Sequence, residues 1–463
     1  MSTITVTNPF DGSQLAEIPK QSAADVELAL TKAYQTFNER EHWLAAYQRI
    51  AILEKTAELM SEQVEELTVL AAKEGGKPYT DSKVEVLRAI QGVKLAIEHI
   101  AQIKGEQIPM GLTPGSANRL AFTQREPIGV VSSVSAFNHP LNLIVHQTVP
   151  AIAVGCPVII KPSDRTPLSC FRFVEILHEA GLPEQWCQAI VCDNDDAEKL
   201  VTDARVNFFS FIGSARVGWM LRSKLAPGTR CALEHGGAAP VIVDQSADIS
   251  GVIDSILKGG FYHAGQVCVS VQRVYAHMSL CENLANLLAS GANQLNVGDP
   301  LKPETEVGPL ITTQEVDRVA QWVDEAVAKG GKILSGGKRL SDTCYAPTVI
   351  LDPPEDCKVS QLEIFGPVVC VYSYEDKDDV VARANSLDVA FQAAVYTQNL
   401  DDALELGNKL NATAVMINDH TAFRVDWMPF GGRDSSGIGM GGIQYSMHEM
   451  TRDKMLVIKS DVL

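Results

Sequence analysis

The sequence predicts an α/β protein with two consecutive, mostly parallel β-sheets, each covered by helices on both faces. Short apolar runs typical of buried strands alternate with helical segments from Val130 to about Ile417. At 463 residues the chain is also too long for one ordinary hydrophobic core, so two or three domains are expected. No repeat with a period of about 20 to 50 residues is present. Two α/β domains in succession fit this length.

The composition is that of an ordinary globular protein with a large interior, because 46% of the residues are hydrophobic and 21% are charged. The 39 Lys and Arg residues are outnumbered by 57 Asp and Glu residues, which gives a formal net charge of −18. Such a charge argues against a nucleic-acid partner and against binding to anionic membranes.

The ten cysteines are scattered without a C-x-x-C pair, and most lie in apolar contexts such as the one around Cys156. This usage is typical of a reduced compartment and favours neither disulfides nor zinc, so no metal site is predicted. The N-terminus has no basic segment followed by an apolar one, and no run of about 18 uncharged apolar residues occurs. We therefore expect a cytoplasmic protein without a membrane segment.

Three long segments near the N-terminus have the periodicity of helices that pack against a core. The first opens with Ser22-Ala23-Ala24-Asp25, a pattern like a capping box, and the second stops at Gly75-Gly76. These helices are expected over residues 22–37, about 41–73, and 80–103.

A linker rich in Gly, Pro and Ser follows at residues 105–118. Leu120–Glu126 and Ile128–Val134 then fit two strands separated by Pro127. This composition is typical of an extended ribbon, which needs a partner surface because two strands alone are marginally stable.

The remaining strands are expected to alternate with helices in two series. One predicted helix begins near residue 141, a second ends at Gly181, a third covers residues 214–225, and a fourth runs from about 249 to 265. The predicted strands are 130–134, 158–160, 188–191, 208–212, 239–243, 269–277, 347–350, 367–373 and 393–396.

Ligands of open parallel sheets collect at the carboxyl ends of the strands, and three such ends carry suggestive residues. The first is Phe208–Ile212, followed by Gly213, which permits a tight turn, and by Ser214, which opens a helix. A helix N-terminus of this kind can hold a phosphate. The pattern is not G-x-G-x-x-G, however, and a plain strand–turn–helix fits it equally well.

The second end is Lys161-Pro162-Ser163-Asp164, which offers a cation and a carboxylate side by side. A ribose needs a carboxylate to accept from its hydroxyl groups, and a nearby lysine helps to hold it. A solvated turn is the alternative.

The third end carries Glu234, which follows an apolar run and precedes Gly236-Gly237. A partly dry crevice would raise the pKa of Glu234 and suit it to act as a general base. A carboxylate that only bonds the glycine backbone is the alternative.

Cys268 lies near the junction between the helical segment that ends at Gly265 and the strand predicted from Val269. A thiol at such a junction becomes a nucleophile if its pKa is lowered or its proton is taken, whereas a thiol inside an element usually packs as a small hydrophobe. Asn138 precedes another helix and is either its cap or an amide donor.

Taken in order and at these spacings, seven motifs resemble those of the aldehyde dehydrogenase superfamily over essentially the whole chain. The motifs are Phe137-Asn138-x-Pro140, Lys161-Pro162-Ser163, Gly213-Ser214-x-x-x-Gly218, Leu233-Glu234-x-Gly236-Gly237, Gly265-Gln266-x-Cys268, Glu363-Ile364-Phe365-Gly366-Pro367 and Pro429-Phe430-Gly431-Gly432.

The resemblance implies a role for each catalytic residue. Cys268 would attack the aldehyde carbon, while Asn138 and the backbone N–H of Cys268 stabilise the oxyanion. Hydride would then leave for the nicotinamide, and Glu234 would activate the water that hydrolyses the thioester. The cofactor residues implied are Lys161, Ser163 and Asp164 near the adenosine ribose, Gly213 and Ser214 at the pyrophosphate, Glu363 at the nicotinamide ribose, and Phe365 beside the nicotinamide.

The resemblance also implies an architecture of two Rossmann-like three-layer domains and a small β-ribbon. A cofactor domain would comprise residues 1–108 and 131–235, and a catalytic domain residues 236–433. Residues 109–130 and 434–463 would form an oligomerisation ribbon, so a homodimer or homotetramer is expected.

The substrate implied is a small aldehyde with an anionic or hydroxylated tail, such as a semialdehyde, lactaldehyde or phosphonoacetaldehyde. Val267 and Val269 flank the thiol with small apolar walls, while His139, His146 and Arg424 lie in segments that line the substrate tunnel of relatives. Alternatively, the arginine and the histidines are surface or structural residues.

Four positions depart from the family pattern. Asp164 stands where many relatives have Glu and leaves space for a 2′-phosphate, so the cofactor is expected to be NAD or NADP, with a slight preference for NAD. Gln147 and Gly441 replace a lysine and a glutamate that are usually tied to proton relay. We therefore expect Glu234 to depend on fewer partners, and hypothesise that it relies on His235, which replaces a more common leucine.

Three alternatives to a hydrolytic aldehyde dehydrogenase remain. A cofactor-free cysteine hydrolase would not need the cofactor motifs at Lys161, Ser214 and Glu363. A non-catalytic relative would normally have lost the thiol or the base. A CoA-acylating enzyme is the nearest competitor, but the retained Glu234 favours hydrolysis to the free acid.

Overall fold

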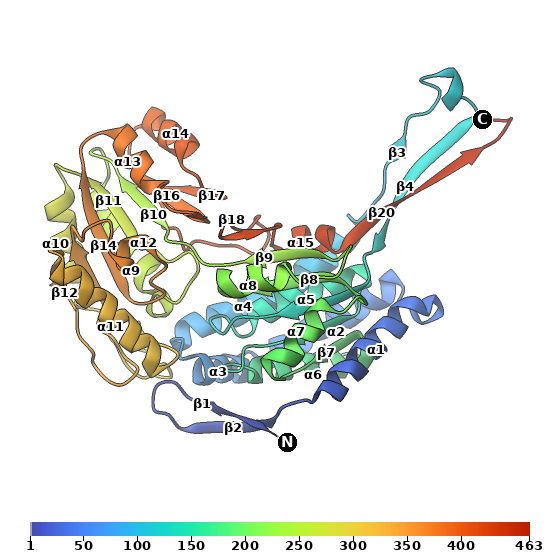
Figure 1. Ribbon diagram of the computed structural model, residues 1–463, viewed down its shortest axis with the longest axis horizontal. Helices are drawn as coiled ribbons and strands as arrows, with labels where there is room; N and C mark the ends of the chain where they lie inside the picture. Colours follow the sequence, from blue (N-terminus) through green and yellow to red (C-terminus); the bar gives the residue numbers. More distant parts are fainter. Residues whose placement is uncertain (1) are drawn as a thin grey trace.

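Two α/β lobes form the body of the molecule, and a β-arm projects from it beside the C-terminus (Figure 1). The computed structural model describes residues 2–463. One lobe contains a six-stranded sheet and the other a seven-stranded sheet, and helices cover both. The predicted α/β class with two mostly parallel sheets is confirmed. Within residues 2–463, no helix combines the length and the apolar character needed to cross a bilayer.

The six-stranded sheet is parallel except at one edge, where a short strand from the C-terminal region pairs antiparallel with its neighbour. Its central strands are buried throughout, as expected for a parallel sheet covered on both faces. In spatial order the strands are β19 (Gly437–Ile438), β9 (Arg230–Glu234), β8 (Val206–Ile212), β5 (Val130–Val134), β6 (Val158–Lys161) and β7 (Cys187–Ala189).

Helices on both faces of this sheet follow the predicted series with one addition, α7, which the sequence analysis did not predict. Among them, α5 is wholly buried and mostly apolar, as expected of a helix in the middle of a core. The helices are α5 (Asn142–Val154), α6 (Leu168–Glu179), α7 (Asn194–Thr202) and α8 (Ala215–Arg222).

The N-terminal region forms a hairpin and four helices that complete this lobe. Ser22 and Asp25 form the predicted capping box of the first helix. The single helix predicted over about 41–73 is wrong, because the backbone leaves helical geometry at Gln63 and divides the segment in two. The elements are β1 (Thr3–Thr7), β2 (Gln14–Pro19), α1 (Ala23–Asn38), α2 (Ala46–Glu62), α3 (Val64–Gly75) and α4 (Tyr79–Ile100).

The seven-stranded sheet is parallel except for its antiparallel edge strand β12. In spatial order its strands are β12 (Lys332–Ser335), β13 (Thr348–Leu351), β14 (Val368–Tyr374), β11 (Arg273–His277), β10 (Pro240–Val243), β16 (Gln392–Tyr396) and β17 (Ala414–Ile417).

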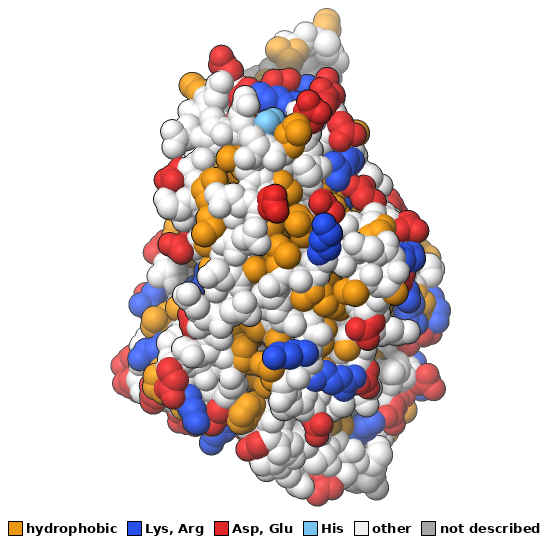
Figure 2. Space-filling model, turned by 90° about the vertical axis from the view of Figure 1, so that its left-hand side faces the viewer, with side chains coloured by type: hydrophobic (Ala, Val, Ile, Leu, Met, Phe, Trp, Pro, Cys, Tyr) orange, Lys and Arg blue, Asp and Glu red, His pale blue; other side chains and the backbone are white. Residues whose placement is uncertain are grey.

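The strand predicted from Val269 is therefore four residues too long at its start, because β11 begins only at Arg273. Six helices flank this sheet, and the outer face of the lobe mixes apolar with charged side chains (Figure 2). The helices are α9 (Ile249–Phe261), α10 (Cys281–Ala292), α11 (Thr313–Ala328), α12 (Lys358–Gln361), α13 (Lys377–Ala384) and α14 (Leu400–Lys409).

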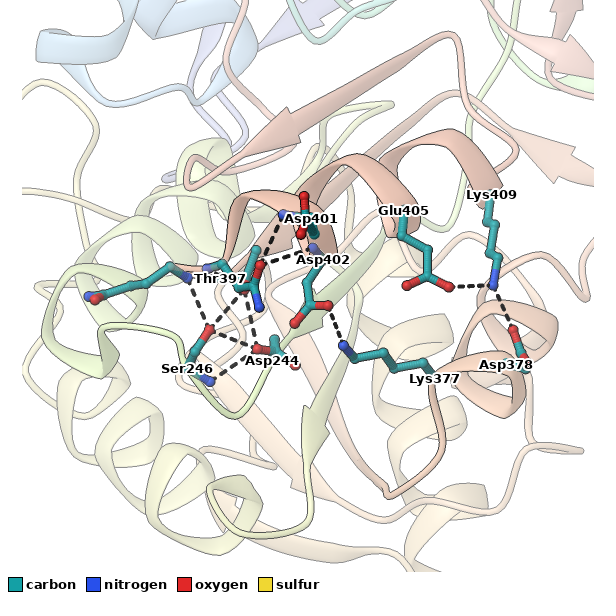
Figure 3. A network of polar contacts seen from close by, with 11 residues as sticks. Asp244, Ser246, Lys377, Asp378, Thr397, Asp401, Asp402, Glu405 and Lys409 are labelled. Carbon is teal, nitrogen blue, oxygen red and sulfur yellow. Dashed lines mark hydrogen bonds and ion pairs between the residues drawn. The ribbon is translucent and has the colours of Figure 1, made fainter.

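A polar network joins the loops at the carboxyl ends of β10 and β16 (Figure 3). Asp244, directly after β10, accepts hydrogen bonds from the backbone N–H and hydroxyl of Ser246 at 3.1 and 2.8 Å and from the Thr397 hydroxyl at 3.2 Å. Asp244 is only 1% exposed. These hydrogen bonds therefore hold the loops after β10 and β16 together.

The projecting arm is a three-stranded antiparallel sheet of β3 (Gln107–Ile108), β4 (Arg119–Pro127) and β20 (Thr451–Lys459). The prediction that Ile128–Val134 belongs to this ribbon is wrong, since β5 lies inside the six-stranded sheet, where its apolar residues are buried. The partner of β4 is instead β20, paired along all nine residues. Three further elements complete the fold. β15 (Val389–Ala390) pairs with β18 (Arg433–Asp434), and α15 (Ile443–Glu449) packs on α4 and α5 and joins β20 of the arm to the body.

Candidate active site

A cleft of about 1270 Å³ lies between the two sheets. It is bordered by the carboxyl ends of β5, β8 and β9 and by the segments that precede β11 and β14. Its volume exceeds the roughly 300–1,000 Å³ of a typical small-molecule site, which leaves room for a dinucleotide together with a small substrate. Twelve of the fifteen predicted site residues line it: Asn138, His139, Ser163, Gly213, Ser214, Glu234, Val267, Cys268, Val269, Glu363, Phe365 and Arg424.

The loop that carries Cys268 has an unusual backbone. After α9 ends, His263, Ala264 and Gly265 follow one another in left-handed conformation, with φ of 48°, 54° and 71°. Each non-glycine residue in this region costs on the order of 1 kcal/mol, so the surrounding packing must hold the loop. Gly265 is required, because a Cβ there would lie 2.1 Å from the Gly366 carbonyl oxygen. The result is a turn that delivers Cys268 to the cleft.

The Cys268 thiol lies among charged groups of both signs. Burial raises the pKa of Cys268 to about 12, the carboxylates of Glu234 and Glu363 act in the same direction, and Arg424 opposes them. The resting thiol is therefore protonated near neutral pH, and a base must take its proton before it can attack.

Glu234, the last residue of β9, places a carboxylate in the same cleft as the thiol. Burial raises its pKa, and Arg424 is the charge that opposes the shift. Its carboxylate rests against Gly441, where an added Cβ would lie 2.1 Å from Glu234 Oε1. The departure at Gly441 thus has a physical consequence, because the missing side chain leaves the space that the Glu234 carboxylate occupies.

Asn138 is tied to the cysteine loop across the cleft. Its amide nitrogen Nδ2 donates to the Gln266 carbonyl at 2.9 Å. It does not cap α5, since that helix begins at Asn142 with Leu141 in the cap position. Of the two roles that the sequence left open, the structure therefore favours the amide donor.

The carboxylate of Glu85 supports the segment that carries Asn138. Glu85 accepts from the backbone N–H groups of Leu141 and Asn142 at 2.9 and 3.0 Å and pairs with the buried ammonium of Lys77. Sequence reasoning missed both. Glu85 lies in a helix whose periodicity indicated only packing, and Lys77 lies in the short loop between two predicted helices.

Gln147 and His235, two of the four positions that depart from the family pattern, hydrogen-bond to backbone carbonyls. The Gln147 amide donates to the Val134 and Ser210 carbonyls at 3.1 and 3.2 Å and so joins β5 to β8. The hypothesis from the sequence is that His235 assists Glu234, but within residues 2–463 its Nδ1 bonds the Gly213 carbonyl at 2.9 Å and not the Glu234 carboxylate.

Glu363 and Phe365 lie on the segment before β14, on the cofactor side of the cleft. The Glu363 carboxylate fills the space beside Gly236, where a Cβ would lie 1.9 Å from its Oε2. Its Oε1 is buried with no protein partner in residues 2–463, and burial raises the pKa of Glu363 to about 8. A buried acceptor without a donor fits a ribose whose hydroxyl groups supply the hydrogen bonds. The Phe365 ring packs edge-on against Phe137, with centroids 5.8 Å apart.

The other predicted cofactor residues lie at the ends of β6 and β8. Ser163, Gly213 and Ser214 line the cleft, and the Ser214 side chain makes no capping bond to α8, which leaves the helix N-terminus free for an anion. Lys161 and Asp164 lie beside Ser163 but outside the cleft lining, paired with each other at 2.7 Å.

Arg424 and the predicted substrate residues form the far wall. The Arg424 guanidinium lies 3.6 Å from the centroid of the Phe430 ring, and its Nη2 is 3.5 Å from His146 Nδ1. Its Nε is buried without a partner within residues 2–463. His146 does not line the main cleft but a small cavity behind Glu234. Val267 and Val269 are buried beside the thiol as predicted.

Arg88 also lines the cleft and is held by Asp426, which does not line it; sequence reasoning missed both. Arg88 forms a two-point ion pair with Asp426 at 3.0 and 2.8 Å, and His146 Nε2 donates to the same carboxylate at 2.8 Å. Only three-dimensional proximity reveals this cluster, because 338 residues separate the two members of the ion pair.

A chain with a half-buried thiol, a carboxylate base and an asparagine amide at one cleft between two α/β sheets has the layout of an aldehyde dehydrogenase. The model of the "Aldehyde dehydrogenase family" matches residues 1–456. The chain therefore belongs to this family of NAD(P)-dependent aldehyde oxidoreductases.

Individual relatives match along almost the whole chain. A 3-sulfolactaldehyde dehydrogenase of Priestia megaterium is 37% identical over 454 residues, which cover 98% of this chain and 94% of the relative. A lactaldehyde dehydrogenase of Methanocaldococcus jannaschii is 34% identical over 458 residues, 98% of this chain and 96% of the relative. The crystal structure of a glyceraldehyde-3-phosphate dehydrogenase from the same archaeon, in complex with NADP, superposes with a TM-score of 0.94 at 33% identity and covers 99% of both chains.

Proposed function

We propose that this protein oxidises a small aldehyde with an anionic tail to the carboxylic acid, with NAD or NADP as the oxidant. The observation that carries the proposal is that Cys268, Glu234 and Arg424 face one cleft and shift one another's pKa. A nucleophile, a base and a fixed cation are then within reach of one small substrate.

Glu234 takes the proton of the Cys268 thiol, and the thiolate attacks the aldehyde carbon. The oxyanion of the resulting thiohemiacetal accepts from the backbone N–H of Cys268 and from the Asn138 amide. Because the bond to Gln266 uses only one of the two amide hydrogens of Asn138, the second is free for this purpose.

The nicotinamide, when bound, supplies the oxidation by accepting the hydride. After Glu234 has released the thiol proton to solvent, it removes a proton from the water that attacks the thioester. The C–S bond then breaks, the carboxylic acid leaves, and Glu234 returns this proton to the Cys268 thiolate. The residues that would hold the cofactor are Glu363 and Phe365 at its nicotinamide end, Gly213 and Ser214 at the pyrophosphate, and Lys161, Ser163 and Asp164 at the adenosine ribose.

Arg424 selects the anionic tail. Its Nε has no protein partner, whereas the nearby Arg88 is already neutralised by Asp426. The small walls of Val267 and Val269 limit the length of the substrate. Relatives named for a sulfonated and for a hydroxylated three-carbon aldehyde support the size class. Semialdehydes and phosphonoacetaldehyde share the same chemistry.

We keep the proposed division into a cofactor domain (1–108 and 131–235), a catalytic domain (236–433) and a ribbon (109–130 and 434–463). We also propose that the protein is a cytoplasmic homodimer or homotetramer assembled through the arm. The apolar side chains of Met455, Leu456, Val457 and Ile458 are 37 to 57% exposed on β20 and offer a surface for a second copy. A slight preference for NAD rests on the carboxylate of Asp164.

The test is an aldehyde panel assayed with NAD and NADP separately. Sulfolactaldehyde, succinate semialdehyde and phosphonoacetaldehyde represent anions, and lactaldehyde is the matched neutral compound. Arg424→Ala should lower kcat/KM for the anions about 10- to 150-fold more than for lactaldehyde, which corresponds to a charged hydrogen bond of roughly 1.5–3 kcal/mol.

Equal losses on all four aldehydes would remove the anion site. Cleavage of an ester or thioester substrate, with no NAD(P)H formed from any of the aldehydes, would indicate a hydrolase, and a requirement for CoA would indicate the acylating type. Cys268→Ala is the blank, expected to abolish turnover while cofactor binding remains.

A further inference from the structure

His235 makes a set of contacts that the proposed chemistry does not use. Its ring is 1% exposed and packs against Phe211 and Trp219, with centroid separations of 5.7 and 5.8 Å. Its Nδ1 lies 2.9 Å from the carbonyl oxygen of Gly213, a residue of the turn that leads from β8 into α8. The histidine of one strand end therefore reaches the first turn after the neighbouring strand.

The backbone of α8 is shaped around this ring. A Cβ on Gly218 would lie 2.0 Å from His235 Cε1 and 2.6 Å from its Nε2, so the glycine leaves the space that the imidazole fills. In this chain, the last glycine of the motif Gly213-Ser214-x-x-x-Gly218 thus accommodates His235.

The peptide groups on either side of Gly213 are fixed by the end of β9. The Gly213 N–H donates to the Glu234 carbonyl at 3.1 Å, and the Gly213 carbonyl accepts from His235. His235 is anchored in turn, because its own N–H donates to the Ser436 carbonyl at 2.9 Å. Both hydrogen-bonding groups of the glycine are therefore held by one strand end.

The hydrogen bond determines the state of the imidazole. A carbonyl oxygen can only accept, so the proton must be on Nδ1. Burial lowers the pKa of His235, although the bond to Gly213 opposes this shift. The ring is therefore neutral at physiological pH and acts as a donor to the turn rather than as a charge.

We propose that His235 is a positioning residue that fixes the Gly213–Ser214 turn and thereby aims the N-terminus of α8 at the diphosphate of the dinucleotide. This inference rests on the proposed function. The Ser214 side chain does not cap the helix, so the orientation of its free N–H groups depends on the turn itself. A residue that acts on a ligand-binding group through one hydrogen bond has the same kind of role as the outer partners of a metal ligand.

Three variants separate the hydrogen bond from the bulk of the ring. His235→Leu keeps much of the volume and loses the donor. His235→Asn carries an amide nitrogen as many bonds from Cα as Nδ1, so it keeps the donor and loses the bulk. His235→Gln carries its nitrogen one bond further away, at the distance of Nε2, and serves as the matched control for Asn.

The readout is the Kd of NAD and of NADP, measured by calorimetry and by the fluorescence of Trp219, which contacts the ring. His235→Leu and His235→Gln should raise both values roughly two- to tenfold, the range of a neutral hydrogen bond. His235→Asn should stay within about twofold of the wild type. The alkylation rate of Cys268 and the Tm report whether the rest of the cleft is intact.

A Kd for His235→Leu equal to that of the wild type overturns the proposal. So does a His235→Asn variant as weak as His235→Leu, because the ring would then act through packing alone. If the wild type binds neither dinucleotide, the proposed function itself fails. If it binds them but the three variants do not differ, only the role of His235 is wrong.

Discussion

Two carboxylates stand at the ends of consecutive strands, yet their surroundings differ completely. Glu234 ends β9 and Asp244 follows β10, in different sheets. Asp244 is almost fully buried and accepts three hydrogen bonds from Ser246 and Thr397 (Figure 3). Glu234 borders the cleft, with no hydrogen bond to its carboxylate from the described part of the chain, and rests against Gly441.

The difference teaches that the position of a carboxylate in a sheet does not decide its function. Ligands of parallel sheets collect at carboxyl ends, and the six-stranded sheet follows that rule. In the seven-stranded sheet the network around Asp244 joins the ends of β10 and β16, and the segments before β11 and β14 face the cleft instead. A carboxylate that accepts hydrogen bonds from the protein has a structural role, whereas one without such donors stays available to a substrate.

The largest effect should come from removing the available carboxylate. Glu234→Gln keeps the shape but cannot accept a proton, so steady-state NAD(P)H formation should fall about 10²- to 10⁴-fold. The Tm should stay within about 1 °C of the wild type, because no hydrogen bond is lost. Turnover within tenfold of the wild type would show that Glu234 is not the base.

The sequence predicted which carboxyl ends of strands carry the site residues, but not the side-chain contacts between those segments. Buried strands such as Val158–Lys161 were located to within a residue, since a short apolar run between turns has few other interpretations. The start of β11 was missed, because residues 269–272 alternate like a strand but are held by side-chain bonds such as that from Gln272 to the Leu362 carbonyl. Arg88 and Asp426 could not be paired from a local pattern, as they meet only in the folded chain.

Removing the structural carboxylate should give the second largest effect, on stability rather than on rate. Asp244→Ala leaves the donors of Ser246 and Thr397 unpaired, which should cost about 1.5–3 kcal/mol, while kcat/KM stays unchanged. Urea unfolding followed beside the steady-state assay measures both. A loss of activity without a loss of stability would contradict the comparison.

The stability difference should also depend on pH. Burial raises the pKa of Asp244, but the hydrogen bonds from Ser246 and Thr397 outweigh it and leave the pKa below its ordinary value. A lowered folded-state pKa stabilises the protein fully above the unfolded pKa of about 3.9, and this contribution is lost as the pH falls through the folded value. The gap between wild type and Asp244→Ala should therefore narrow on acidification, and a constant gap would mean that charge plays no part.

Charges around the thiol should produce a smaller effect, with opposite signs in two variants. Arg424 lowers the pKa of Cys268 and Glu234 raises it. At a pH well below that pKa, each unit changes the thiolate fraction about tenfold. Alkylation by iodoacetamide without cofactor follows the equilibrium thiolate fraction and does not need the proton transfer to Glu234, so it should be slower in Arg424→Ala and faster in Glu234→Gln, by up to roughly tenfold each. Changes in the same direction would show that access, and not charge, controls the thiol.

The smallest effect should come from filling the space behind the base. In Gly441→Ala the new Cβ would lie 2.1 Å from Glu234 Oε1 and 2.9 Å from the Phe430 carbonyl oxygen, so the flexible carboxylate must move toward the cleft and the backbone must shift slightly. An off-rotamer side chain costs about 0.5–1.5 kcal/mol, and a displaced carboxylate occupies space that the aldehyde needs. The KM for the aldehyde should therefore rise about two- to tenfold with little change in kcat. Gly407→Ala is the control, because a Cβ at that position of α14 makes only an ordinary contact at 3.8 Å with Ile417. A lower kcat at unchanged KM would mean that Gly441 affects the chemistry of Glu234 and not only its position.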